Sequence, residues 1–201
     1  MARTRQQPGV ETSTRILDAA EKLVQRRGFN GFSYADIASE LGITTASLHY
    51  HFPSKAALGQ ALIKRYTTRF TDELSAIDAS VPTIVGRLEA YANLYASVLE
   101  QERFCLCGML AAEYDTLPET MRDAVIDFFD KNEAWLTHGL EFGREQGELA
   151  FAGSAVDEAR LIVGGLEGAM LVARPYRDIT RFQAAAVQLL MGLRNTATTT
   201  S

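Results

Sequence analysis

Apolar residues recur at helical spacing along almost the whole chain, and no stretch shows the strict alternation of a half-buried strand. In the first such segment Ile16, Ala19 and Leu23 share one face, and Gly28 follows where a left-handed residue ends a helix. The sequence therefore predicts an all-α protein of about nine helices, with a small N-terminal three-helix unit and a larger helical bundle. The helices are expected at residues 11–27, 33–41, 44–52, 54–77, 82–100, 105–114, 118–146, 155–173 and 180–194.

Composition excludes several classes of protein. No apolar run is long enough to cross a bilayer, and the polar first residues have no apolar core of a signal peptide, so we expect a cytoplasmic protein with no membrane contact. The chain has two cysteines and three histidines, too few for a predicted metal centre. No nucleophile motif, paired metal ligands or glycine-rich phosphate loop occurs. We therefore predict no enzymatic activity, no catalytic residue and no cofactor.

Charge is unevenly distributed along the chain. Residues 1–55 carry seven basic and five acidic side chains, a net charge of +2, whereas the remainder carries −7. The first quarter can approach a polyanion, and the rest would be repelled by one.

Two short helical segments are separated by a single glycine in YADIASELGITTASLHYHFPSKAAL, residues 34–58. Ser33 and Asp36 have the spacing of a capping box, with Asp in place of Glu. Gly42 suits the positive φ of a tight turn, and Leu48 anchors the second segment on its inner side. This is the layout of a helix-turn-helix.

The outward side of the second segment has no acidic residue, which suits a surface that approaches phosphates. Its small first residues permit entry into a major groove, and its hydroxyls and imidazoles can bind phosphates or base edges. Lys55 adds a positive charge at the start of the next helix. The alternative is an ordinary hydroxyl-rich, solvent-facing helix. His51 either packs and caps locally or contacts phosphate.

The stretch GFNGFSYADIASELGITTASLHYHFPSKAAL resembles the N-terminal domain of the TetR family of bacterial transcriptional regulators, over about residues 15–63. The resemblance implies a homodimer, usually a repressor, that binds a double-stranded DNA operator. It also implies a DNA-binding domain at residues 1–55 and a ligand-binding and dimerisation domain at residues 56–201.

By that resemblance, one group of side chains faces bases or the groove, and a second group contacts phosphates. His49 departs from the pattern, since many members have Tyr there, and its imidazole can change the contact. Arg3 and Arg5 either enter a minor groove or belong to an unbound tail. The first group is Thr45, Ala46 and His49; the second is Ser33, Tyr34, Thr44, Tyr50 and Lys55.

The last two helices are the expected dimer interface. Residues 155–173 carry Gly164, Gly165 and Gly168, which permit close helix approach, and residues 180–194 are apolar around most of their circumference. Two such helices from each subunit would form a four-helix interface. The alternative is that both are core helices of a monomer.

Large aromatic and polar side chains in the bundle suggest a cavity for a lipophilic inducer, although each aromatic taken alone also suits plain packing. Glu113 and Glu167 lie on otherwise apolar helices, where each either binds a cation or faces solvent. The candidate ligand-binding residues are Tyr91, Tyr95, Cys105, Met109, Trp135 and His138.

Cys105 and Cys107 are two residues apart at a predicted helix start, so their side chains point in different directions. The helix start and the nearby Arg103 favour a reactive thiolate at Cys105, and the alternative is two buried apolar thiols. The segment CLCGMLAAEYDTLPETMR is weakly similar to TetR-type members that sense electrophiles through a cysteine. We therefore predict a dimeric, sequence-specific repressor released by a small-molecule or thiol-reactive inducer. An all-α enzyme with a vestigial helix-turn-helix and a purely protein-binding module are the alternatives.

Overall fold

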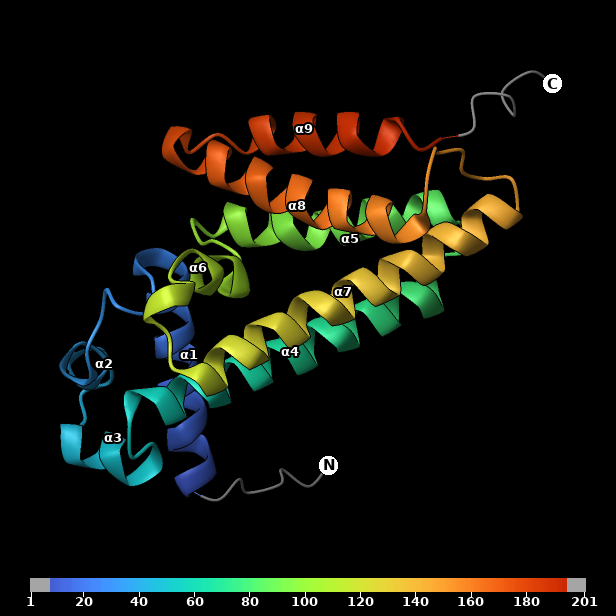
Figure 1. Ribbon diagram of the computed structural model, residues 1–201. Coiled ribbons are helices and arrows are strands. Elements are labelled where there is room, and N and C mark those ends of the chain that lie inside the picture. Colours follow the sequence, from blue (N-terminus) through green and yellow to red (C-terminus); the bar gives the residue numbers. More distant parts are fainter. Residues whose placement is uncertain (1–7, 195–201) are drawn as a thin grey trace, which may run out of the picture. The chain divides into compact units, whose positions relative to one another are not determined.

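The computed structural model describes residues 8–194, and these residues form nine α-helices and two short 3-10 turns (Figure 1). The predicted all-α class is therefore confirmed. Arg3 and Arg5 lie outside the described residues. The helices are α1 (Pro8–Arg27), α2 (Tyr34–Leu41), α3 (Thr45–His51), α4 (Lys55–Ser80), α5 (Ile84–Glu100), α6 (Leu106–Ala112), α7 (Glu119–Glu145), α8 (Ala155–Ala173) and α9 (Ile179–Met191).

Local signals explain where these helices begin and end. The hydroxyls of Thr83 and Ser154 each accept a hydrogen bond from a backbone N–H in the first turn of the helix that follows, α5 and α8 respectively. Gly28 and Gly42 follow α1 and α2 with φ of 82° and 65°, as the sequence predicts. Four ends differ from expectation by about three residues: α1 begins earlier, at Pro8, α4 continues to Ser80, α9 ends at Met191, and a 3-10 turn replaces the last residues expected in α6.

The chain divides into two compact units. Unit 1 comprises residues 8–66 and 106–125 of the described chain, and unit 2 comprises residues 67–105 and 126–194. Unit 1 thus contains α6 in addition to the N-terminal helices, which the sequence did not indicate. The proposed functional boundary after residue 55 remains a prediction.

Unit 1 is built around apolar side chains that the helical pattern places inward. Ile16, Ile37, Leu48 and Leu58 have no exposed surface, so α1 to α4 share one core. On the rim of that core, Arg65 of α4 donates to the carboxylates of Asp18 (2.8 Å) and Glu21 (2.9 Å) of α1.

In unit 2, α8 and α9 lie along each other and α5 lies against both (Figure 1). The side chain of Leu189 on α9 occupies the space where Gly165 of α8 has no Cβ. No helix of the described residues is long and apolar enough to cross a membrane.

Candidate nucleic-acid interface

The α2–turn–α3 segment is held by backbone and side-chain hydrogen bonds that the sequence anticipates. The Asp36 carboxylate accepts hydrogen bonds from the backbone N–H (2.7 Å) and hydroxyl (2.6 Å) of Ser33, so the predicted capping box is present. These hydrogen bonds from Ser33 are the main reason that the pKa of Asp36 lies below its ordinary value. Ile43 N–H donates to the Ala38 carbonyl at 3.1 Å and closes the turn after Gly42.

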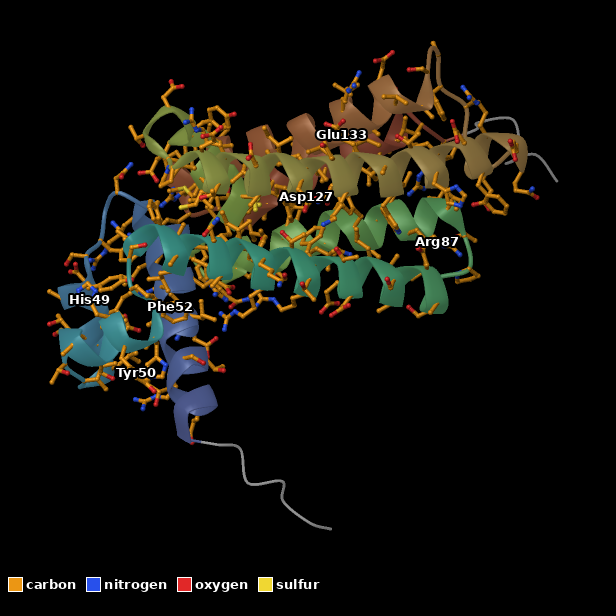
Figure 2. The ribbon with its side chains drawn as sticks, turned by 60° about the horizontal axis from the view of Figure 1, so that its bottom comes forward. His49, Tyr50, Phe52, Arg87, Asp127 and Glu133 are labelled. Carbon is orange, nitrogen blue, oxygen red and sulfur yellow. The ribbon has the colours of Figure 1, made fainter. Side chains whose placement is uncertain are left out.

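Helix α3 exposes a set of uncharged donors and acceptors. Thr44, Thr45, Ala46, His49 and Tyr50 are exposed, and Tyr50 has 85% of its surface accessible. Figure 2 shows His49 and Tyr50 on α3 and Phe52 just beyond it. An exposed tyrosine with so little packing contact has no structural reason for its position. The predicted outward face of α3 is therefore available to a partner.

His49 is oriented by its neighbours. Its Nδ1 lies 3.3 Å from the carbonyl of Pro53, and because a carbonyl only accepts, Nδ1 carries the proton. Its ring contacts that of Tyr34, with centroids 4.8 Å apart. In the tautomer that carries its only proton on Nδ1, Nε2 is an acceptor.

Tyr34 is half-buried and tied to the end of α3. Its hydroxyl donates to the Phe52 carbonyl at 2.8 Å, and partial burial raises the pKa of Tyr34 to about 12. The phenol therefore stays a neutral donor, and this bond fixes α2 against α3.

Lys55 occupies a different position from the one its predicted phosphate contact suggests. Its Nζ donates to the Phe32 carbonyl and lies over the rings of Phe29 (4.8 Å) and Phe32 (4.3 Å). Burial lowers the pKa of Lys55, and Glu113 and Asp36 oppose that shift. Lys55 thus braces the connection between α1 and α2.

The sequence did not reveal a contact between α6 and that same connection. The Glu113 carboxylate, just after α6, accepts hydrogen bonds from the backbone N–H of Phe29 (2.5 Å) and Asn30 (3.2 Å). We call this contact the Glu113 clamp. Gly28 has a φ of 82°, which favours glycine, and a Cβ there would lie 2.6 Å from Oε1 of Glu113 and displace the carboxylate. The sequence alone could not predict this contact, because 84 residues separate Phe29 from Glu113.

The predicted ligand-binding residues fall into three places. Tyr91, Tyr95 and Cys105 are buried in unit 2, at most 2% exposed. Trp135 stacks on Tyr91 with centroids 5.6 Å apart and planes at 24°. His138 is exposed on α7, and Met109 lies on α6 in unit 1. The structure therefore brings together Tyr91, Tyr95 and Trp135, and it leaves Met109 in the other unit.

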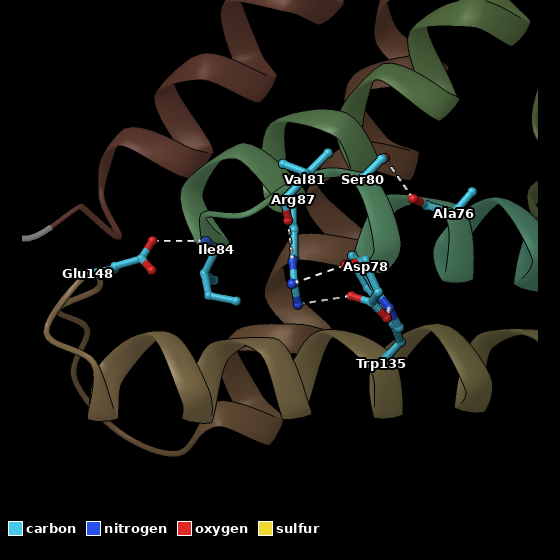
Figure 3. A network of polar contacts seen from close by, with 8 residues as sticks. All are labelled: Ala76, Asp78, Ser80, Val81, Ile84, Arg87, Trp135 and Glu148. Atoms are coloured by element: carbon cyan, nitrogen blue, oxygen red, sulfur yellow. Dashed lines mark hydrogen bonds and ion pairs between the residues drawn. The ribbon is translucent and has the colours of Figure 1, made fainter.

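Around Trp135, polar contacts join the end of α4, the start of α5 and α7 (Figure 3). The indole N–H of Trp135 donates to Asp78 at 2.8 Å, and Arg87 donates to the carboxylate of Asp78 and to the carbonyl of Val81. The cavity beside these groups, which His138 also lines, measures about 40 Å³. Such a space holds a few water molecules and is far smaller than an ordinary small-molecule site.

Two protein-family models match this chain, one over the helix-turn-helix region and one over most of the remaining helices. Residues 16–62 match the model of bacterial regulatory proteins of the tetR family, and residues 85–189 match a tetracyclin repressor-like C-terminal domain. The HTH-type transcriptional repressor NemR of Escherichia coli K12 is 28% identical over 182 residues, which cover 87% of this chain and 90% of NemR.

Solved structures with the same fold include two close neighbours. A TetR-family regulator from Agrobacterium tumefaciens is 34% identical with a TM-score of 0.90, and the match covers 92% of this chain and 99% of that one. The reduced form of E. coli NemR is 26% identical with a TM-score of 0.82, covering 93% and 99%.

Proposed function

The chain belongs to the TetR family of bacterial regulatory proteins, and from this premise we propose that it is a cytoplasmic, dimeric repressor released from its operator by a lipophilic or thiol-reactive small molecule. The observation that carries the proposal is the exposed, acid-free face of α3. Its uncharged donors and acceptors suit a major groove, where a second helix of this kind reads base edges.

Side chains on this face divide by what they can contact. Thr45, Ala46 and His49 are proposed to reach bases, and an acceptor Nε2 of His49 suits the amino group of adenine or cytosine. Ser33, Tyr34, Thr44 and Tyr50 lie at the ends and flanks and are proposed as phosphate contacts. Ser33 and Tyr34 reach a phosphate through their hydroxyls only if these leave Asp36 and the Phe52 carbonyl. Lys55 reaches a phosphate only if its ammonium leaves the Phe32 carbonyl, so its first role is to support the α1–α2 connection.

The dimer is proposed to form through α8 and α9. Leu171 and Val172 of α8 and Val187 and Met191 of α9 are each more than half exposed. A Cβ at Gly164 or Gly168 would meet open space, so these positions are free to accept a partner helix. Exposed apolar side chains that continue over two packed helices suit an isologous four-helix interface.

We propose that α6 carries the inducer signal to the DNA-binding helices. Cys105 precedes the first residue of α6 directly, and the Glu113 clamp follows its last turn. A change at Cys105 that displaces α6 would release the α1–α2 connection and alter the position of α2 and α3. NemR, one of the relatives, was solved in a reduced form, which agrees with a role for a thiol in such regulation.

Two substitutions on α3 test the DNA-reading role. Tyr50→Ala should weaken binding to every sequence by about tenfold, the loss of one charge-assisted hydrogen bond to phosphate. Thr45→Val keeps the shape but removes the hydroxyl. It should change the ratio of affinities for operators that differ at one base pair by about tenfold or more. Fluorescence anisotropy on a panel of operator variants measures both the affinity and the base preference. Tyr176→Ala is the control, because Tyr176 is an exposed tyrosine in unit 2.

The two classes of side chain must behave differently for this assignment to hold. Equal losses for Tyr50→Ala and Thr45→Val with unchanged base preference would refute the division into phosphate and base contacts. Unchanged affinity in both variants would remove α3 from the DNA interface.

A further inference from the structure

His49 differs from the other exposed side chains of α3 because one of its two ring nitrogens already has a partner within the protein (Figure 2). Nδ1 lies 3.3 Å from the Pro53 carbonyl oxygen, which can only accept a hydrogen bond, so Nδ1 carries a proton in this contact. The ring of Tyr34 lies against the imidazole, with centroids 4.8 Å apart. Within residues 8–194, Nε2 has no hydrogen-bond partner. Nε2 is therefore the nitrogen that remains for a molecule bound to α3.

The charged and titratable groups around His49 are engaged elsewhere. Tyr34 of α2 donates its hydroxyl to the end of α3, and its pKa of about 12 keeps it neutral. The Asp36 carboxylate is bound in the capping box at the start of α2, and the Lys55 ammonium is bound to the connection between α1 and α2. On α3 itself, His51 contacts a neighbouring tyrosine ring. A change of charge on His49 therefore breaks no ion pair among the described residues.

The two charge states of this ring present opposite hydrogen-bonding groups at Nε2. In the neutral form with its proton on Nδ1, Nε2 accepts a hydrogen bond, whereas in the imidazolium both nitrogens carry protons and Nε2 donates one. The contact with Pro53 is the same in both states, because Nδ1 donates in each. Imidazole is also the side chain that ordinarily changes charge between about pH 5 and 8. Protonation of His49 thus reverses the polarity of Nε2 and leaves the anchoring contact intact.

Base pairs of DNA differ in this same polarity at a single place in the major groove. Adenine has an amino group where guanine has a carbonyl oxygen, and cytosine has an amino group where thymine has an oxygen. An accepting Nε2 suits the amino group, and a donating Nε2 suits the oxygen. Exchanging A·T for G·C at one base pair therefore changes which charge state of an imidazole fits.

We propose that His49 selects a base by hydrogen-bond polarity, so that the protein prefers adenine or cytosine at one position when the imidazole is neutral and guanine or thymine when it is protonated. This inference rests on the proposed function, because it requires α3 to read bases. It goes beyond that function by making the preferred operator depend on pH.

A ratio of affinities is the quantity that isolates this effect. An added positive charge on α3 is attracted to the phosphates, so the affinity for any DNA rises somewhat as pH falls. Two operators that differ at one base pair share this gain, and it cancels in their ratio. The change that remains in the ratio comes from the base contact.

A transition scan of the selected operator tests the proposal. Each base pair of one half-site is exchanged in turn, A·T for G·C or the reverse, and fluorescence anisotropy gives the affinities at about pH 8 and about pH 6, on either side of the ordinary range of histidine. The lower pH stays above the isoelectric point of about 5.3. At one base pair the affinity ratio should shift by at least about tenfold toward guanine or thymine at the lower pH. The other base pairs should keep their ratios.

Substitution of each histidine assigns the effect, since the chain has three. His49→Gln carries an amide that both donates and accepts at either pH, so its ratios should be the same at the two pH values. His138→Gln is the matched control, because His138 is an exposed histidine on α7 in unit 2, and its pH dependence should equal that of the natural protein. His51→Gln should also keep the shift in the ratio.

Nuclear magnetic resonance tests the position of the proton without DNA. In protein with isotope-labelled histidine, long-range nitrogen–proton couplings distinguish a ring protonated at Nδ1 from one protonated at Nε2. The signals that disappear in His49→Gln belong to His49. At about pH 8 they should show the proton on Nδ1, as the contact with Pro53 requires.

Three results would overturn the proposal. They are ratios that stay the same at both pH values for every base pair, a shift that persists in His49→Gln, and a neutral His49 ring with its proton on Nε2. The failure of the proposed function looks different. The protein would then enrich no DNA sequence at either pH, and the base contact of His49 would fall with it, whereas specific binding with pH-independent ratios would leave the proposed function standing.

Discussion

Replacing Leu171 with glutamate should convert the protein to a monomer and weaken operator binding by at least about 100-fold. Leu171 is 60% exposed on α8, within the apolar surface proposed to meet its counterpart in a second subunit. In an isologous interface each substitution occurs twice, so two carboxylates would be buried near one another without partners. A monomer also loses the gain in affinity that comes from binding two half-sites at once.

Sedimentation velocity and anisotropy on the same preparations measure both effects. Val187→Glu on α9 should reproduce them, since Val187 is 54% exposed on the neighbouring helix. Ile126→Glu is the control, because Ile126 is an equally apolar side chain, 45% exposed, on α7. A Leu171→Glu protein that remains a dimer and binds DNA normally would exclude α8 from the interface.

Replacing Glu113 with glutamine should separate DNA binding from the response to the inducer. The carboxylate accepts two backbone hydrogen bonds, from Phe29 and Asn30, and its charge acts on Lys55. The amide of glutamine accepts one of these bonds and turns a donor group toward the other N–H. Since hydrogen bonds to charged groups contribute about 2 kcal/mol, we expect a loss of about that size in the free energy of unfolding.

The functional consequence follows from the proposed signal route, in which a change at Cys105 acts through α6 and the Glu113 clamp. Glu113→Gln should still bind the operator, but N-ethylmaleimide should no longer release it. Urea unfolding and anisotropy with and without the reagent give the two readings. Asp115→Asn serves as the control, because this exposed carboxyl lies two residues away and outside the clamp. Normal release in Glu113→Gln would show that the signal travels by another route.

Local features of the DNA-binding unit could be predicted because their causes lie within a few residues. The capping box of Ser33 and Asp36 depends on a spacing of three, and the left-handed φ of Gly42 depends on one residue type at a helix end. The inward positions of Ile37 and Leu48 follow from helical period alone.

Long-range contacts could not be predicted, since nothing local encodes them. Glu113 and Glu167 both looked like isolated acids on apolar helices, yet Glu113 binds backbone N–H groups 83 and 84 residues away and both carboxyl oxygens of Glu167 are buried. The hydrogen bond from the Lys55 ammonium to the Phe32 carbonyl joins groups 23 residues apart and was not predicted, and the expected phosphate contact of Lys55 stays a prediction. The cavity expected from the number of aromatic residues stays a prediction: the space beside Trp135 measures about 40 Å³, and an open pocket of about 400 Å³ lies on α7 beside His138.

Selection of DNA from a random duplex pool, followed by anisotropy on the enriched sequence, tests the central claim most directly. The account predicts an inverted repeat whose half-sites are centred about one helical turn, or a multiple of it, apart. It also predicts a dissociation constant of about 10 nM or below that rises steeply with salt. Failure to enrich any sequence with a preparation shown to be folded and dimeric would contradict it, and the exposed face of α3 would then need another partner.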